Sequence, residues 1–157
     1  MAREHEFYLF SRTIDVERFW KIWRNKESNS QIIDRVIIHD DIILYIMDTL
    51  KWIPSRNPAL MGIPASTGIN YYGLTLFDEV SAGNLKSVFS SWRDLFLNSP
   101  AVLELKGGYI MIEGEEQSGH YEKLVYNRDE IAKQFEKIIS FADRLAEGEC
   151  YLYHCGI

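Results

Sequence analysis

The stretch AVLELKGGYIMIEGEEQSGHYEKLVYNRDEIAKQFEKIISFADRLAEGECYLYHC, residues 101–155, decides the fold class. Its first part contains two apolar runs, residues 101–106 and 109–113, on either side of Gly107-Gly108. A glycine pair between apolar runs is typical of a tight hairpin turn, because glycine adopts the positive φ angles that such turns require. These runs therefore predict two antiparallel strands joined at the glycine pair.

The helix that follows has the clearest pattern in the chain. After a third strand expected over 120–126, Asn127 stands three residues ahead of Glu130, as the partners of a capping box do. Gly148 suits the C-terminal cap of this helix, and a closing strand is expected over 150–154. A three-strand meander, a helix and a returning strand predict an α+β fold, in which an antiparallel sheet of about five or six strands carries helices mainly on one face.

The sequence upstream supplies the remaining elements. Residues 6–10 predict a strand, and the apolar spacing that begins at Val16 predicts an amphipathic helix. Residues 71–77 predict another strand. Residues 84–97 predict a helix that ends ahead of Pro100, because proline disfavours helical geometry in the residue before it.

One segment, residues 31–53, suits two interpretations. The β-branched residues between 32 and 38 would suit a strand. The spacing of the apolar residues also suits a helix, and we favour a helix over most of the segment. A break would separate it from a second helix at 42–52, capped by Asp40 or Asp41.

The composition is that of a single globular domain. The chain has 157 residues, of which 46% are hydrophobic and 25% charged, enough to build a core without disulfides or metals. Three of the four prolines fall within residues 54–70. We interpret that segment as a long ordered loop inside one domain that covers residues 1–157.

The net charge of −6 argues against a nucleic-acid partner and against an anionic membrane surface. The N-terminus lacks the apolar run of a secretory signal, and the longest apolar run, residues 42–47, is too short to cross a bilayer. Two cysteines in one expected strand suggest reduced thiols, so we expect a cytoplasmic protein. Phosphate-binding glycine motifs are absent from the sequence, and we expect no cofactor.

Soft metal ligands come close together only at Cys150, His154 and Cys155. On a strand, residues 150 and 154 face one side and residue 155 faces the other, which makes three-point binding awkward. We therefore expect no metal site.

Acid–base chemistry is the alternative that the sequence leaves open. His39 and Asp40 stand side by side, and His120 lies in the C-terminal part of the chain. In a small enzyme or ligand-binding domain these residues would serve a pocket near the 54–70 loop. Helix capping by Asp40 explains the same residues without any chemistry.

The densest acidic feature of the chain lies within residues 113–122. Carboxylates on an exposed loop can receive a basic protein surface, and tyrosines on neighbouring strands can anchor an interface. The residues predicted to bind a partner are Glu113, Glu115, Glu116, His120, Tyr121 and Glu122.

The tail from residue 127 to residue 157, with its capped helix and final Tyr-Leu-Tyr-His-Cys-Gly-Ile, resembles the endings of small bacterial polymorphic-toxin immunity proteins. The resemblance carries no specific motif and no site residues. It implies a non-enzymatic protein that binds and blocks a cognate toxin in the bacterial cytoplasm. We therefore predict a non-enzymatic protein-binding domain, with self-association through the 54–70 loop as a further alternative and the oligomeric state unpredicted.

Overall fold

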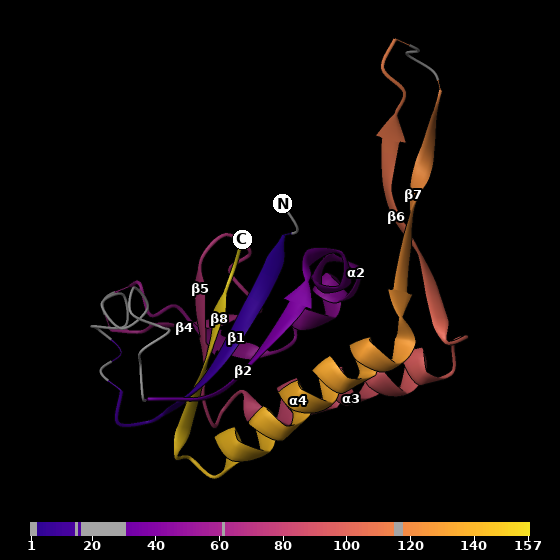
Figure 1. Cartoon of the computed structure of the whole chain (residues 1–157). Helices are drawn as coiled ribbons and strands as arrows, with labels where there is room; N and C mark the ends of the chain where they lie inside the picture. The colour runs from indigo at the N-terminus through magenta and orange to yellow at the C-terminus, as the bar shows by residue number, and fades with distance from the viewer. Residues whose placement is uncertain (1–2, 15, 17–30, 61, 115–117) are drawn as a thin grey trace.

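A computed structural model describes the chain except for residues 1–2, 15, 17–30, 61 and 115–117 (Figure 1). In this part of the chain a six-stranded antiparallel sheet has the order β2-β1-β8-β5-β3-β4. Its strands are β1 (Glu4–Ser11), β2 (Ile32–His39), β3 (Pro54–Arg56), β4 (Ala65–Thr67), β5 (Leu74–Phe77) and β8 (Cys150–Cys155). The predicted α+β class and the predicted size of the sheet are confirmed.

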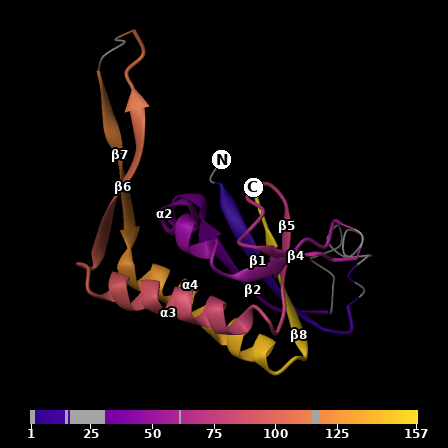
Figure 2. The same cartoon turned by 180° about the vertical axis from the view of Figure 1, so that it is seen from behind.

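Two further strands form a separate sheet that stands away from the rest of the molecule (Figures 1 and 2). They are β6 (Val102–Met111) and β7 (Gly119–Asn127), which we call the arm. The helices of the described residues are α2 (Asp40–Leu50), α3 (Ala82–Leu97) and α4 (Arg128–Ala146). In the chain the arm connects α3 to α4, and it rises from one end of this pair of helices (Figure 1).

The main core lies between one face of the large sheet and the three helices. Phe7 of β1 and Leu152 of β8 are buried in it together with apolar side chains of α2, α3 and α4. Between α3 and α4, Phe89 and Phe135 meet edge to face with ring centroids 5.1 Å apart, the geometry that aromatic rings favour. A smaller core on the other face of the sheet contains Tyr153 and other buried residues of β1, β5 and β8.

The closing strand is confirmed and lies near the middle of the sheet. β8 pairs with β1 on one side and with β5 on the other. The C-terminal strand thus joins the two halves of the sheet, and all six of its residues are buried or half-buried.

The preferred helix over 31–38 is wrong. These residues form β2, an edge strand whose Val36 and Ile38 are buried against β1 and the helices. The β-branched composition therefore outweighed the helical spacing, because such side chains pack well on a pleated surface. The second helix is confirmed as α2, although its N-cap is His39, whose side chain accepts a hydrogen bond from the Asp41 backbone.

The hairpin turn predicted at Gly107-Gly108 is also wrong. β6 runs through both glycines as one strand and pairs directly with β7, so the expected meander of three strands is a ribbon of two. The glycine pair marks a β-bulge, another structure in which glycine is common.

Two other predictions meet the structure only in part. Residues 54–70 contain the short strands β3 and β4, so that segment is not one continuous loop. The strand predicted over 71–77 is confined to β5. The helix predicted from Val16 falls almost entirely outside the described residues.

No helix in the described part of the chain has both the length and the apolar character needed to span a membrane.

Candidate protein interface

The arm is a two-stranded antiparallel ribbon. Its pairing runs from Val102 opposite Asn127 at the base to Met111 opposite Gly119 towards the tip. At about 3.3 Å per residue, the ten residues of β6 span roughly 30 Å. Among the described residues no third strand pairs with it, so each strand has one free edge. Such an edge offers unpaired backbone groups to another chain.

The bulge in β6 depends on its first glycine. A Cβ atom at Gly107 would lie 3.1 Å from side-chain atoms of Glu122 and Leu124, whereas one at Gly108 would meet open space. Gly107 therefore lets β7 pass close to the bulged backbone. Because a bulge increases the local twist of a ribbon, it sets how the outer half of the arm is turned relative to the base.

Large apolar side chains are exposed along the arm. Tyr109 and Met111 alternate with Ile110, so they lie on the opposite face of the ribbon. An isolated two-stranded hairpin is marginally stable in water, and exposed apolar patches on a folded protein commonly mark an interaction site. Between 44% and 57% of each side chain is exposed for Tyr109, Ile110, Met111, Ile112, Tyr121 and Val125.

One face of the ribbon is preorganised by aromatic contacts. The rings of Tyr109 and Tyr121 meet edge to face across the strands, with centroids 5.1 Å apart. The ammonium group of Lys106 lies 3.5 Å from the centre of the Tyr121 ring, a cation–π contact. On the same face Lys123 and Glu104 form an ion pair at 2.8 Å. These contacts hold large side chains in place before any partner arrives.

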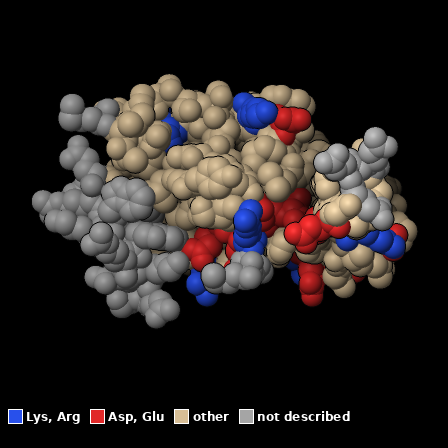
Figure 3. Space-filling view, turned by 90° about the horizontal axis from the view of Figure 1, so that it is seen from above, with Lys and Arg blue, Asp and Glu red and all other residues tan. Residues whose placement is uncertain are grey.

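Three of the residues predicted to bind a partner, His120, Tyr121 and Glu122, lie on the arm, and Glu113 lies just beyond the end of β6. His120 lies opposite Ile110, and Tyr121 lies opposite Tyr109. Viewed from above, acidic side chains lie on the arm and beside it, with fewer basic ones between them (Figure 3). The structure shows Glu113, His120, Tyr121 and Glu122 exposed, whereas Glu115 and Glu116 lie outside the described residues.

Sequence reasoning missed the apolar half of this surface. Tyr109, Ile110 and Met111 belong to an apolar run without polar alternation, which is typical of a strand buried on both faces. Their exposure depends on β6 leaving the main sheet, and no local pattern records that departure. In the sequence, only the acidic residues next to this run indicated that the surface is exposed.

The base of the arm is tied to α2. The Tyr126 hydroxyl donates to the Asp41 carboxylate at 2.6 Å and lies 2.8 Å from Nδ1 of His39. Burial, followed by the hydrogen bond to Asp41, raises the pKa of Tyr126 well above its usual value. Leu103 and Leu124 are buried at the same end. The arm therefore has a fixed base and an exposed outer half.

A groove of about 530 Å³ separates the arm from α2. Its apolar walls come from both elements, and the carboxylates of Asp41 and Glu122 border it. Because Asp41 is engaged by Tyr126, the groove belongs to the anchored end of the arm. The residues that line it are Asp41, Leu44, Tyr45, Lys106, Gly107, Gly108, Glu122 and Leu124.

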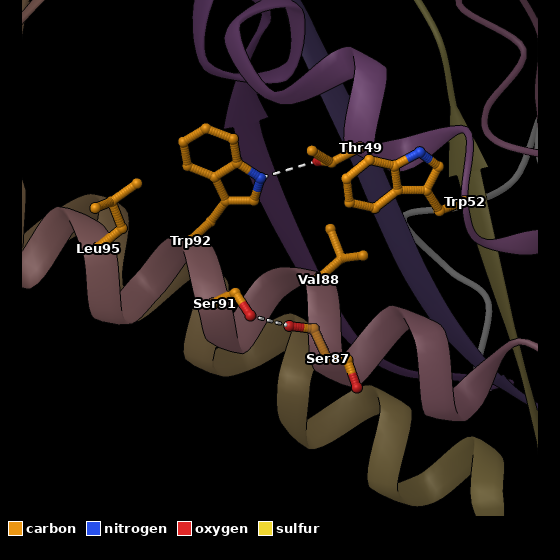
Figure 4. Close-up of a pocket in the computed structure, with 7 residues that line it drawn as sticks. All are labelled: Thr49, Trp52, Ser87, Val88, Ser91, Trp92 and Leu95. Carbon is orange, nitrogen blue, oxygen red and sulfur yellow. Dashed lines mark hydrogen bonds between the residues drawn. The ribbon is translucent and has the colours of Figure 1, made fainter.

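A second groove, of about 320 Å³, lies between α2 and α3 (Figure 4). The indole rings of Trp52 and Trp92 form its walls, and Val88 lies between them. The Trp92 Nε1–H donates to the Thr49 hydroxyl at 2.9 Å, which fixes one wall. The residues that line it are Thr49, Trp52, Ser87, Val88, Ser91, Trp92 and Leu95.

A chain of polar groups crosses the main core. Nε2 of His5 lies 3.0 Å from the Asp40 carboxylate, and Nδ1 of His5 lies 2.8 Å from Nε2 of His154. The Tyr71 hydroxyl donates to the same carboxylate oxygen at 2.5 Å. Because a carboxylate only accepts, His5 donates from Nε2 and accepts at Nδ1, and His154 donates from Nε2. Nδ1 of His154 is then a buried acceptor without a hydrogen-bond partner among the described residues.

Burial favours the neutral form of both His5 and His154. It lowers the pKa of His154 to about 3, with a smaller contribution from His5. It also lowers the pKa of His5, against the opposing effect of the Asp40 carboxylate. Burial and the bond to Asp40 raise the pKa of Tyr71 to about 12. His5, His154 and Asp40 are buried, and Tyr71 is half-buried, so we interpret the network as a structural element of the core.

The soft ligands noted in the sequence are divided by the sheet. Cys150 is buried in the main core, and Cys155 is buried in the smaller core on the other face. His154 is engaged by His5. Within the described residues no three His, Cys, Asp or Glu side chains gather as a metal site would require.

The residues of the enzymatic alternative do not converge. Asp40 is buried with His5 and Tyr71, whereas His39 contacts Tyr126 at the base of the arm. His120 stands six residues from Tyr126 along β7, roughly 20 Å away. Neither groove described above is lined by a residue of the 54–70 segment.

Comparisons of the chain with protein-family models, with curated proteins and with solved structures find no match.

Proposed function

We propose that this chain is a non-enzymatic protein-binding domain that engages a partner protein through its β6–β7 arm. One observation carries the proposal: a preorganised ribbon stands clear of the core with large apolar side chains exposed on both faces. Exposed tyrosines such as Tyr109 and Tyr121 are the residue type that most often anchors interfaces. The arm thus supplies the apolar centre of an interface.

The charges of the arm favour a basic partner. Among the described residues neither Glu113 nor Glu122 takes part in an ion pair, whereas Glu104 is paired with Lys123. Free carboxylates beside an apolar patch would meet lysines or arginines around the partner's binding cleft, and this complementarity would mainly raise the association rate. The net charge of −6 acts in the same direction.

The resemblance of residues 127–157 to polymorphic-toxin immunity proteins suggests what such a partner is. An immunity protein blocks a toxin by occupying its surface, which requires a rigid binding element and no catalysis. We propose a toxin domain with a basic cleft as the partner class, and the bacterial cytoplasm as the place where the two meet.

Affinity capture with matched variants tests this function. The purified chain is immobilised, lysate of the native host is passed over it, and retained proteins are identified by mass spectrometry. We expect one stoichiometric partner, weakened by high salt. We expect Met111→Ser to lose it, because Met111 is 57% exposed on the outer half of the arm.

Val80→Ser is the control, since Val80 is 59% exposed but lies in the turn before α3. It should retain the partner to the same extent as the unaltered chain. Retention of the partner by Met111→Ser, or equal loss in both variants, would contradict binding through the arm. Recovery of nothing from lysate in which the candidate toxin is expressed would contradict the binding function itself.

The alternative is a small enzyme or ligand-binding domain that uses His39, Asp40 or His120. It has less support, because Asp40 is buried in the core network and His120 lies on the arm. Groups for general acid–base catalysis have to reach the same substrate.

A further inference from the structure

The groove between α2 and α3 has mainly apolar walls, and most of its polar groups are already hydrogen-bonded. The Thr49 hydroxyl donates to the Ile46 carbonyl and accepts from Trp92. The Ser91 hydroxyl donates to the Ser87 carbonyl, and the Ser87 hydroxyl points away from the indole rings (Figure 4). Small-molecule sites normally combine apolar walls with a few free polar groups. The groove therefore suits apolar side chains of a protein.

The same surface also presents the side chains that would fill such a groove. Trp52 is 65% exposed and Leu95 is 59% exposed, and both stand on the rim of the groove that they help to line. A projecting indole beside an indole-walled groove is self-complementary. In a two-fold dimer, Trp52 of each copy would enter the groove of the other.

The charges around the groove are compatible with binding a second copy of the same surface. Next to the lining residues of α2, Asp48 and Lys51 form an ion pair at 2.8 Å. Next to those of α3, Arg93 and Asp94 form another at 3.0 Å. A rim of one sign would repel a second copy of itself, whereas a rim with both signs lets opposite charges meet across a two-fold axis.

The exposed area is close to what a weak dimer needs. Aromatic residues bury about 150–250 Å² each. Trp52, Tyr45 and Leu95 are 65%, 43% and 59% exposed, and with their charged neighbours they would offer roughly 500 Å² per copy. A pair would bury about 1,000 Å², the lower limit for a specific interface. We propose that the chain forms a two-fold dimer through the α2–α3 face, with micromolar affinity. This dimer does not depend on the function proposed for the arm.

Sedimentation velocity of the full chain between about 1 and about 200 µM tests the dimer. We expect a monomer–dimer equilibrium in this range. Leu95→Glu should raise the dimer dissociation constant at least ten-fold, because it places a carboxylate against the apolar groove of the other copy. Trp52→Ser should have the same effect, and it alters an exposed residue outside the helices.

Leu97→Glu is the matched control. It makes the same change in the same last turn of α3, two residues further on and therefore on the opposite side of the helix. It should dimerise as the unaltered chain does, with an unchanged circular dichroism spectrum. A chain that remains monomeric at about 200 µM would overturn the proposal, as would unchanged dimerisation of Leu95→Glu and Trp52→Ser.

Discussion

Nδ1 of His5 accepts a hydrogen bond from Nε2 of His154 over 2.8 Å, inside a core where neither ring is exposed. The two residues are 149 positions apart in the chain and meet because β1 and β8 are neighbours. The Asp40 carboxylate holds one end of the pair, and the other end is an acceptor without a hydrogen-bond partner among the described residues. Two neutral imidazoles buried in this way make the fold sensitive to acid.

We predict that stability falls as the pH drops below about 6.5. The folded-state pKa of His154, about 3, lies below the value of 6.5 for an exposed histidine, so the unfolded chain binds the proton first. The stabilisation is complete above pH 6.5 and is lost as the pH falls towards 3. His154 alone should remove about 2 kcal/mol between pH 7.5 and pH 5, and His5 acts in the same direction.

Urea unfolding at several pH values measures this slope. His154→Leu should flatten it by about 1.4 kcal/mol per pH unit. A free energy of unfolding that stays constant from pH 7.5 to pH 5 would show that the buried pair does not titrate in this way.

We predict opposite effects for the same substitution at two glycines. Gly148 follows α4 with a φ of +77°, where a side chain is strained, so Gly148→Ala should cost about 1 kcal/mol. Gly83 lies exposed in α3, and a Cβ there would meet no atom within 4 Å. Gly83→Ala should therefore stabilise the chain by about 0.5 kcal/mol. Chemical denaturation measures both changes, and a shift in the same direction would contradict the helix-cap argument.

We predict that Tyr126 holds the arm in position. Tyr126→Phe removes the bond to Asp41 and should cost about 1 kcal/mol. Amides of β7 should then exchange with solvent faster than in the unaltered chain, while those of β8 should not. Tyr121→Phe is the control, because the contacts of Tyr121 with Tyr109 and Lys106 are made through its ring. Equal exchange in the two variants would argue against anchoring by the hydroxyl.

We predict that Asn127 contributes its side chain to α4. Its oxygen accepts hydrogen bonds from the backbone of Asp129 and Glu130 at 2.9 and 3.1 Å. Asn127→Ala should cost about 1 kcal/mol, whereas Asn127→Asp should cost much less because aspartate caps equally well. Thermal unfolding at neutral pH distinguishes the two. An equal loss in both variants would point to the pairing of Asn127 with Val102 instead.

The parts of the fold that sequence predicts well are those with local causes. The cap at Asn127, the helix that begins there and the strand that follows it were all predicted, because each depends on residues a few positions apart. Residues 31–38 were misassigned because β-branched side chains at helical spacing fit either element, and pairing with β1 decided between them.

The site depends on contacts that no local pattern records. Asp40 was noted for chemistry, yet its partners His5 and Tyr71 lie 35 and 31 residues away and place it in the core. The carboxylates of Glu113 and Glu122 were noted from the charge pattern of the sequence, and they lie on or beside the arm. The apolar surface beside it was missed, because Gly107-Gly108 resembles a turn when the bulged strand is not known.

The position of the arm in the chain determines which part of it can change without affecting the core. Its strands connect α3 to α4, and its base is buried in the main core, whereas its outer half stands clear of the helices (Figure 1). The outer half of the ribbon can therefore lengthen or shorten without disturbing the core, provided that residues are added or removed in opposed pairs, so that each side chain keeps its face of the ribbon. A scaffold built in this way keeps its recognition surface apart from its core, so that side chains on the outer half of the ribbon can change without altering the packing beneath them.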